Sequence, residues 1–83
     1  MALSSFLEQM MNGTVYRIER DRGTFWIRSD TSPSVPQGTE FFAHRTSLVR
    51  PKWFTQLQEG DRVRFDPDME AMRGPRAEQV VPL

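Results

Sequence analysis

The segment Arg22-Gly23-Thr24-Phe25-Trp26-Ile27 places a turn glycine before a short run of β-branched and aromatic residues. A second segment of similar character follows at Phe41-Phe42-Ala43-His44. Aromatic and β-branched residues that follow a glycine-containing turn or loop are typical of β-strands. The two segments therefore predict a pair of short strands, and the rest of the chain can be arranged around this pair.

Alternation along these two strands predicts one apolar face and one face that carries rings, because successive side chains of a strand point to opposite sides. The side chains expected to face inward are Phe25, Ile27, Phe41 and Ala43. Those expected to face outward are Thr24, Trp26, Arg28, Phe42 and His44. Flat rings beside a cation indicate a surface for unpaired bases, whose stacking on a ring contributes about 1–3 kcal/mol. The alternative is that the rings belong to the core and are covered by an end or a lid of a small barrel.

The length and composition limit the protein to one small domain. The chain has 83 residues, one histidine and no cysteine, which excludes disulfides and argues against a zinc site. No apolar run approaches the roughly 20 residues of a membrane span, and the N-terminus lacks the pattern of a secretory signal. We therefore expect a cytoplasmic protein with no membrane segment, no metal and no cofactor.

The charge is balanced overall but unevenly distributed. Eleven basic and eleven acidic residues give a formal net charge of zero, which argues against tight binding to duplex DNA. Residues 13–52 hold seven basic and four acidic side chains. The aromatic strands therefore lie in a mildly basic half, although an ordinary solvated surface could have the same distribution.

Residues 1–12 differ from the rest of the chain because their apolar residues recur at helical spacing. These residues are Leu3, Phe6, Leu7, Met10 and Met11. Ser5 and Glu8 fit a capping box. We expect an N-terminal extension that forms a short amphipathic helix or tail and docks or frays, since so short a helix is not stable alone. The expected state is a monomer, with a dimer through residues 3–11 as the alternative.

Beyond residue 12 the turn signals divide the chain into five short strands. They are expected at 13–19, 24–29, 40–45, 62–66 and 75–81, with Pro67 ending the fourth. Strict alternation would place Arg17 on the same face as Val15, which a bulge or an exposed edge would resolve. Short strands separated by turns in this way predict a closed all-β barrel.

The long connection between the third and fourth strands contains two large rings, Trp53 and Phe54. Residues 46–49 are expected to form one helical turn. The rings either plug an end of the barrel or lie exposed for a ligand. We expect one ring to do each.

Five segments match, in the same order, the motifs of bacterial cold-shock proteins and of the cold-shock domains of Y-box proteins. They are 13–18, 22–27, 41–44, 57–65 and 74–80. The corresponding family patterns are Gly-x-Val-Lys-Trp-Phe, Lys-Gly-Phe-Gly-Phe-Ile, Val-Phe-Val-His, Leu-x-Glu-Gly-x-x-Val-x-Phe and Gly-Pro-x-Ala-x-x-Val. The chain thus resembles this family over about residues 13–83.

The resemblance implies a five-stranded antiparallel OB-fold barrel that binds single-stranded RNA or DNA by base stacking. Such a protein acts as an RNA chaperone or as a regulator of transcription or translation. In this sequence Trp26, Phe42 and His44 keep a ring at the family's stacking positions, and Trp53 or Phe54 falls near a loop aromatic. The full set of candidate nucleic-acid contacts is Tyr16, Arg17, Arg22, Thr24, Trp26, Arg28, Phe42, His44, Arg45, Trp53 and Phe54.

The chain departs from the family pattern at three ring positions, which hold Arg17, Thr24 and Arg45. Arginine can stack through its planar guanidinium group, whereas threonine cannot. Phe25 also replaces a glycine on the inward face. We therefore expect a lower affinity, or a base preference that differs from the pyrimidine tendency of the family.

Two other classes of function are alternatives to nucleic-acid binding. An enzyme is not expected, because the single histidine and the scattered carboxylates form no recognisable catalytic motif. A protein-interaction module is the stronger alternative, in which a barrel that has lost part of its binding face uses residues 1–12 and the Trp53-Phe54 pair as a partner surface.

Overall fold

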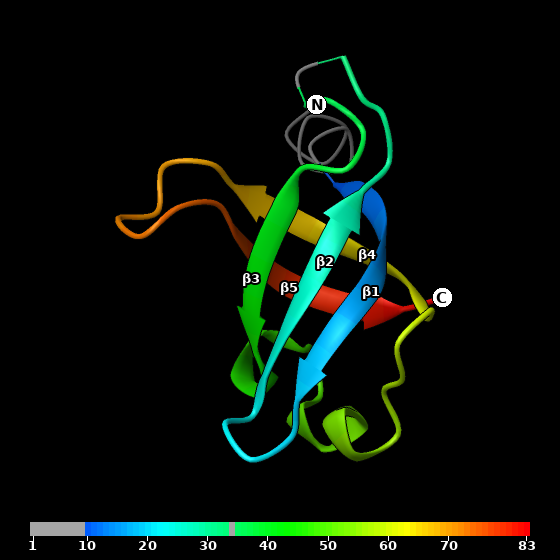
Figure 1. The fold of residues 1–83 in the computed structure, drawn as a ribbon. Coiled ribbons are helices and arrows are strands. Elements are labelled where there is room, and N and C mark those ends of the chain that lie inside the picture. Colours follow the sequence, from blue (N-terminus) through cyan, green and yellow to red (C-terminus); the bar gives the residue numbers. More distant parts are fainter. Residues whose placement is uncertain (1–9, 34) are drawn as a thin grey trace, which may run out of the picture.

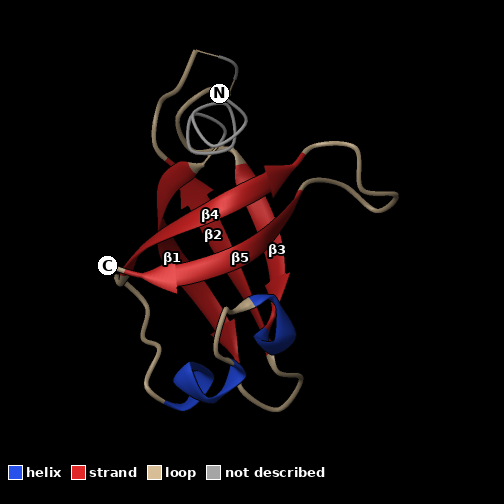
Figure 2. Ribbon diagram, turned by 180° about the vertical axis from the view of Figure 1, so that it is seen from behind, coloured by secondary structure: helices blue, strands red, loops and turns tan. Residues whose placement is uncertain are grey.

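The computed structural model describes residues 10–33 and 35–83, which form one β-barrel with two short 3₁₀ segments (Figure 1). The strands are β1 (Met11–Glu19), β2 (Thr24–Ser29), β3 (Glu40–His44), β4 (Arg62–Asp68) and β5 (Arg76–Pro82). The 3₁₀ segments are η1 (Arg45–Ser47) and η2 (Pro51–Thr55). β1, β2 and β3 form one side of the barrel, and β4 and β5 cross behind them, as the view from the opposite side shows (Figure 2).

The sheet closes on itself in the order β1-β2-β3-β5-β4. This arrangement fits the OB-fold, a five-stranded Greek-key barrel. The expectation of a wholly antiparallel barrel is wrong in one place, because β3 and β5 run parallel where Phe42 pairs with Arg76. An odd number of strands cannot alternate in direction all the way round, so a closed barrel of five must contain a parallel pair.

The predicted inward face is confirmed. Phe25, Ile27, Phe41 and Ala43 are all fully buried. They join β1, β4 and β5 side chains in a single apolar core. Alternation therefore assigned the inward side chains correctly, and Trp26 and Phe42 between them are half-buried, but Thr24, which was also expected to face outward, is only 8% exposed.

A β-bulge resolves the position of Arg17. The pairing of β1 with β2 shifts between Val15, which is opposite Ile27, and Arg17, which is opposite Trp26. The extra residue, Tyr16, lets Val15 stay fully buried while Arg17 is exposed. The bulge was one of the two solutions expected from the sequence.

Phe54 plugs the end of the barrel next to the β1–β2 turn. Its side chain is only 7% exposed and lies 6.2 Å from the Phe25 ring, between centroids. The guanidinium group of Arg20 donates hydrogen bonds to the backbone carbonyl oxygens of Phe54 and Leu57, which ties η2 to the β1–β2 turn. Arg20 therefore supports the fold, a role that the sequence analysis did not anticipate.

The expectation that Pro67 ends the fourth strand is wrong. β4 continues to Asp68, with Pro67 opposite Ala77 of β5. β1 pairs with β4 only as far as Phe65. Beyond that point one side of β4 has no partner strand among residues 10–33 and 35–83, and proline is tolerated at such an edge.

The predicted N-terminal extension covers residues 1–12, of which residues 1–9 lie outside the described part of the chain. The prediction that the extension reaches residue 12 is wrong, because Met11 and Asn12 belong to β1 and pair with Phe65 and Arg64. Met11 is buried in the core. The barrel therefore already includes residue 11.

Candidate nucleic-acid interface

Four side chains form a row across the outside of the barrel, and we call it the aromatic row. Arg17 of β1 is opposite Trp26 of β2, and Trp26 is opposite Phe42 of β3. Phe42 in turn pairs with Arg76 of β5. Directly opposed residues of neighbouring strands project from the same face. The row therefore has two rings in the middle and a guanidinium group at each end.

The two rings of the row contact each other edge to face. Their centroids are 5.1 Å apart and their planes cross at 68°. Both side chains are half-buried. Edge-to-face contact is a favoured arrangement for an aromatic pair. Because the two ring planes are steeply inclined, the flat faces of Trp26 and Phe42 point in different directions.

Carboxylates of the same sheet lie close to the arginines of this face. Arg17 is paired with Glu19 at 3.6 Å and Arg28 with Glu40 at 3.8 Å. Exposed pairs of this kind contribute little stability. They nevertheless reduce the positive potential available to a phosphate, so a ligand must compete with both carboxylates.

Tyr16 is occupied by a protein contact. The Arg28 guanidinium lies 4.0 Å from the centroid of its ring. Burial and then the neighbouring Glu40 carboxylate raise the pKa of the Tyr16 phenol above its ordinary value, so the hydroxyl stays protonated at neutral pH. In this state Tyr16 supports Arg28 and does not offer an open ring to a base.

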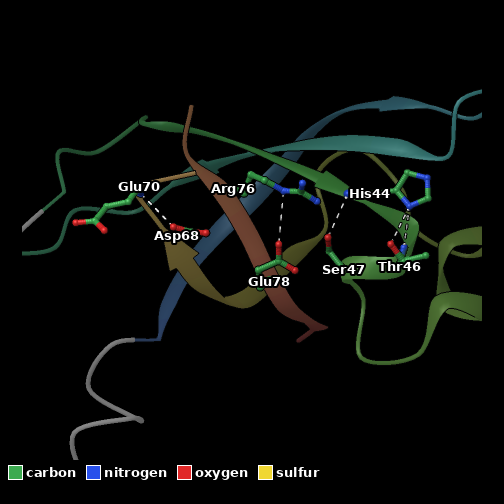
Figure 3. A network of polar contacts seen from close by, with 7 residues as sticks. All are labelled: His44, Thr46, Ser47, Asp68, Glu70, Arg76 and Glu78. Atoms are coloured by element: carbon green, nitrogen blue, oxygen red, sulfur yellow. Dashed lines mark hydrogen bonds and ion pairs between the residues drawn. The ribbon is translucent and has the colours of Figure 1, made fainter. Parts of the chain in front are cut away.

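His44 holds the start of η1 as well as lying on the candidate face. Its Nδ1 accepts a hydrogen bond from the Thr46 backbone N–H at 3.2 Å, and the Ser47 hydroxyl oxygen accepts one from the His44 backbone N–H at 3.4 Å (Figure 3). Since Nδ1 accepts, the proton of the neutral ring lies on Nε2. The ring is half-buried and its orientation is set by this cap.

Thr24 and the two arginines of the β1–β2 end differ in accessibility. Thr24 is only 8% exposed and donates a hydrogen bond to Glu19 at 3.3 Å, so it offers little contact surface. Arg22 and Arg45 are exposed, and within residues 10–33 and 35–83 neither forms an ion pair. This end of the face therefore carries the cations that phosphates can reach most easily.

Trp53 and Phe54 do not extend the face. Phe54 is buried in the core, so it cannot stack on a base. Trp53 is half-buried and lines a hollow with Asp61 and Pro82, at the ends of β4 and β5 rather than beside the aromatic row. Phe54 is thus the expected plug, whereas Trp53 is partly buried and packs against the core, so the prediction that one of the two rings lies exposed for a ligand is not confirmed.

The sequence analysis missed Arg76. Its guanidinium lies 5.7 Å from the centroid of the Phe42 ring, and it lines a cavity between that ring and the β4–β5 loop. A signal was present in the sequence, because Ala77, the small apolar residue of the last strand, is expected to face inward and its neighbour must then point outward. The pairing of β5 with β3, which brings Arg76 to the rings, could not be read from local alternation.

Other classes of site find no support in the part of the chain that the structure describes. It contains no group of three or more histidine, cysteine, aspartate or glutamate side chains placed to hold a metal. It also contains no helix long and apolar enough to cross a membrane.

No family model matches the chain, and no curated protein matches it significantly. The resemblance to cold-shock domains therefore depends on the five sequence motifs, and the strand order is compatible with it.

Proposed function

We propose that the protein binds single-stranded RNA or DNA on the outer face of β1, β2 and β3. The observation that carries this proposal is the aromatic row, in which Trp26 and Phe42 lie side by side between Arg17 and Arg76. Rings that stack on bases and cations that reach phosphates are the two elements of single-strand binding. The proposed setting is the cytoplasm, in an RNA-chaperone or regulatory role.

Binding of this kind is passive. Bases stack on Trp26 and Phe42, while Arg22 and Arg45 contact the backbone near the β1–β2 turn. Binding to the unpaired strand shifts the equilibrium away from weak secondary structure by mass action. The mechanism requires neither a catalytic group nor a cofactor.

Alanine substitution of either ring tests the proposal. Each of Trp26→Ala and Phe42→Ala is expected to weaken binding of an oligonucleotide of about eight nucleotides roughly 5- to 150-fold, because one stacked base contributes about 1–3 kcal/mol. The measurement is fluorescence anisotropy of a labelled strand at low salt. Circular dichroism of each variant shows whether the barrel is retained.

A matched control is Val49→Ala, which shortens an exposed apolar side chain away from this face. It should bind as the unchanged protein does. In a Trp53→Phe background, quenching of the remaining tryptophan should report contact at Trp26 alone. If neither ring variant loses affinity although the fold is intact, the proposal is wrong.

A protein-interaction surface is the second candidate, and the pairing of Arg17 and Arg28 with carboxylates favours it. The two functions differ in salt dependence. Contact with two to four phosphates of a single strand predicts a slope of log affinity against log salt of about −1.5 to −3. An absence of binding to any single strand at low salt would leave the interaction module as the better explanation.

A further inference from the structure

A cavity of about 620 Å³ lies between the aromatic row and the β4–β5 loop. Trp26 and Phe42 line it from β2 and β3, and Asp68, Arg76 and Glu78 line it from β4 and β5. The loop projects to one side of the barrel, next to β3 (Figures 1 and 2). The volume is in the range of about 300–1,000 Å³ that is usual for small-molecule sites, so a nucleobase fits within it.

Two residues that line this cavity carry unsatisfied N–H donors. Trp26 Nε1 and Arg76 Nε are shielded from solvent and have no hydrogen-bond partner among the described residues. Glu78 Oε1 lies 3.5 Å from Arg76 Nε, which is close enough for an ion pair but lacks hydrogen-bond geometry (Figure 3). Buried donors without acceptors are unfavourable, so an acceptor from a ligand would be stabilised here. The Arg76 side chain is 40% exposed and can turn toward that ligand without disturbing the core.

The charges around the cavity favour a base over a phosphate. Its lining contains two arginines, Arg73 and Arg76, and two carboxylates, Asp68 and Glu78. A phosphate placed here would be repelled by both carboxylates. A neutral base that offers acceptors to the N–H donors and donors to the carboxylates would satisfy both sets of groups.

On these grounds we propose that the cavity is a guanine-selective subsite, an inference that rests on the proposed binding of single strands. Guanine carries two adjacent acceptors, O6 and N7, where adenine has one acceptor and one amino donor. Its opposite edge carries N1–H and the exocyclic amino group, which a carboxylate can accept together. The base enters beside Phe42, with O6 and N7 toward Trp26 Nε1 and Arg76 and its N–H groups toward Asp68 or Glu78.

The test compares labelled oligouridines of about eight nucleotides that differ in one central base. Guanine is expected to increase affinity about tenfold relative to adenine, as one well-placed pair of hydrogen bonds does. Replacing guanine by 7-deazaguanine, which lacks N7, or by hypoxanthine, which lacks the amino group, should each remove a large part of that gain. These comparisons use the unchanged protein, so they do not depend on the folding of a variant.

Two substitutions locate the donors. Trp26→Phe keeps an aromatic ring but removes the N–H, and Arg76→Met keeps an unbranched apolar side chain without an N–H group. Each should reduce the ratio of guanine to adenine affinity to about one or two. The matched control is Arg64→Met on β4, which should leave the ratio at about tenfold.

The results distinguish a failure of the guanine subsite from a failure of the proposed single-strand binding. If the strands bind but guanine and adenine bind equally, or if both donor variants keep the full ratio, the guanine subsite is wrong while single-strand binding stands. If none of the strands binds at low salt, the proposed function fails, and the subsite fails with it.

Discussion

At the scale of single residues, Gly13 is required by close packing. A Cβ atom at this position would lie 2.7 Å from the Arg28 carbonyl oxygen, 2.7 Å from Ile27 Cγ2 and 3.2 Å from Phe65 Cε1. Gly13 pairs with Ser29 of β2 on one side and with Val63 of β4 on the other. The glycine of the Gly-x-Val motif thus lies where the neighbours of β1 leave no room for a Cβ atom.

The first prediction concerns this contact. Gly13→Ala should lower the free energy of unfolding by roughly 1–3 kcal/mol, because the methyl group forces the backbone of β2 or the Ile27 side chain to move. Urea denaturation followed by circular dichroism measures the change.

Gly38 provides the comparison for that experiment. Nothing lies within 4 Å of a Cβ at this position, but its φ is +84°. Gly38→Ala should therefore cost about 1 kcal/mol through backbone conformation alone. An unchanged midpoint for Gly13→Ala would contradict the packing argument.

At the scale of elements, the strands that form the candidate interface also carry carboxylates that oppose phosphate binding. Glu19 lies on β1 near Arg17, and Glu40 lies on β3 opposite Arg28. The cations are thereby held against the sheet with their charge partly neutralised. Under the proposed function, affinity for a phosphate backbone would thus depend on carboxylates that contact no ligand.

The second prediction follows from these pairs. Glu19→Gln and Glu40→Gln should each strengthen binding of a single strand roughly two- to fivefold, in line with the weak energy of exposed ion pairs. The matched control is Glu59→Gln, an exposed carboxylate that accepts a hydrogen bond from the Ile18 backbone N–H. An equal gain with Glu59→Gln would mean that net charge, not release of the arginines, controls affinity.

At the scale of the whole molecule, one polar cluster joins three segments where the barrel closes. Arg62 of β4 donates hydrogen bonds to both carboxylate oxygens of Asp30, at 2.9 and 2.6 Å, and to the Thr14 hydroxyl of β1 at 2.9 Å. The hydrogen bond from Arg62, together with its positive charge, lowers the pKa of Asp30 below its usual value. The cluster links β4 to β1 and to the chain that leaves β2.

The third prediction is the pH dependence of this cluster. A lowered pKa in the folded state means that the carboxylate stabilises the fold above the unfolded-state pKa of about 3.9, and that this contribution is lost as the pH falls through the folded-state value. Asp30→Asn should therefore melt at a lower temperature than the unchanged protein at pH 7, and the difference should vanish in acid. Thermal unfolding between about pH 7 and pH 2 measures it.

Asp21→Asn is the control for the titration. Asp21 is an exposed turn residue that forms no ion pair within the described residues. Its substitution should leave the melting temperature close to that of the unchanged protein at every pH in the same range. A difference between Asp30→Asn and the unchanged protein that persists in strong acid would show that the pair acts through packing and not through charge.

The sequence by itself determined the inner and outer faces of β2 and β3 and the number of strands. Phe25, Ile27, Phe41 and Ala43 could be assigned to the core because a period of two is a local property of the backbone. The bulge at Tyr16 was one of two expected solutions, since a charged Arg17 cannot share the buried face with Val15. These assignments need no knowledge of which strands become neighbours.

Only the tertiary structure decided which side chains of the candidate interface are open to a ligand. Closure of the barrel places Arg76 of β5 beside Phe42. Folding also places the Arg28 guanidinium group over the Tyr16 ring. Packing against Phe25 removed Phe54 from the surface. Such outcomes depend on contacts between segments far apart in the chain, whereas periodicity reports only the direction of a side chain within its own strand.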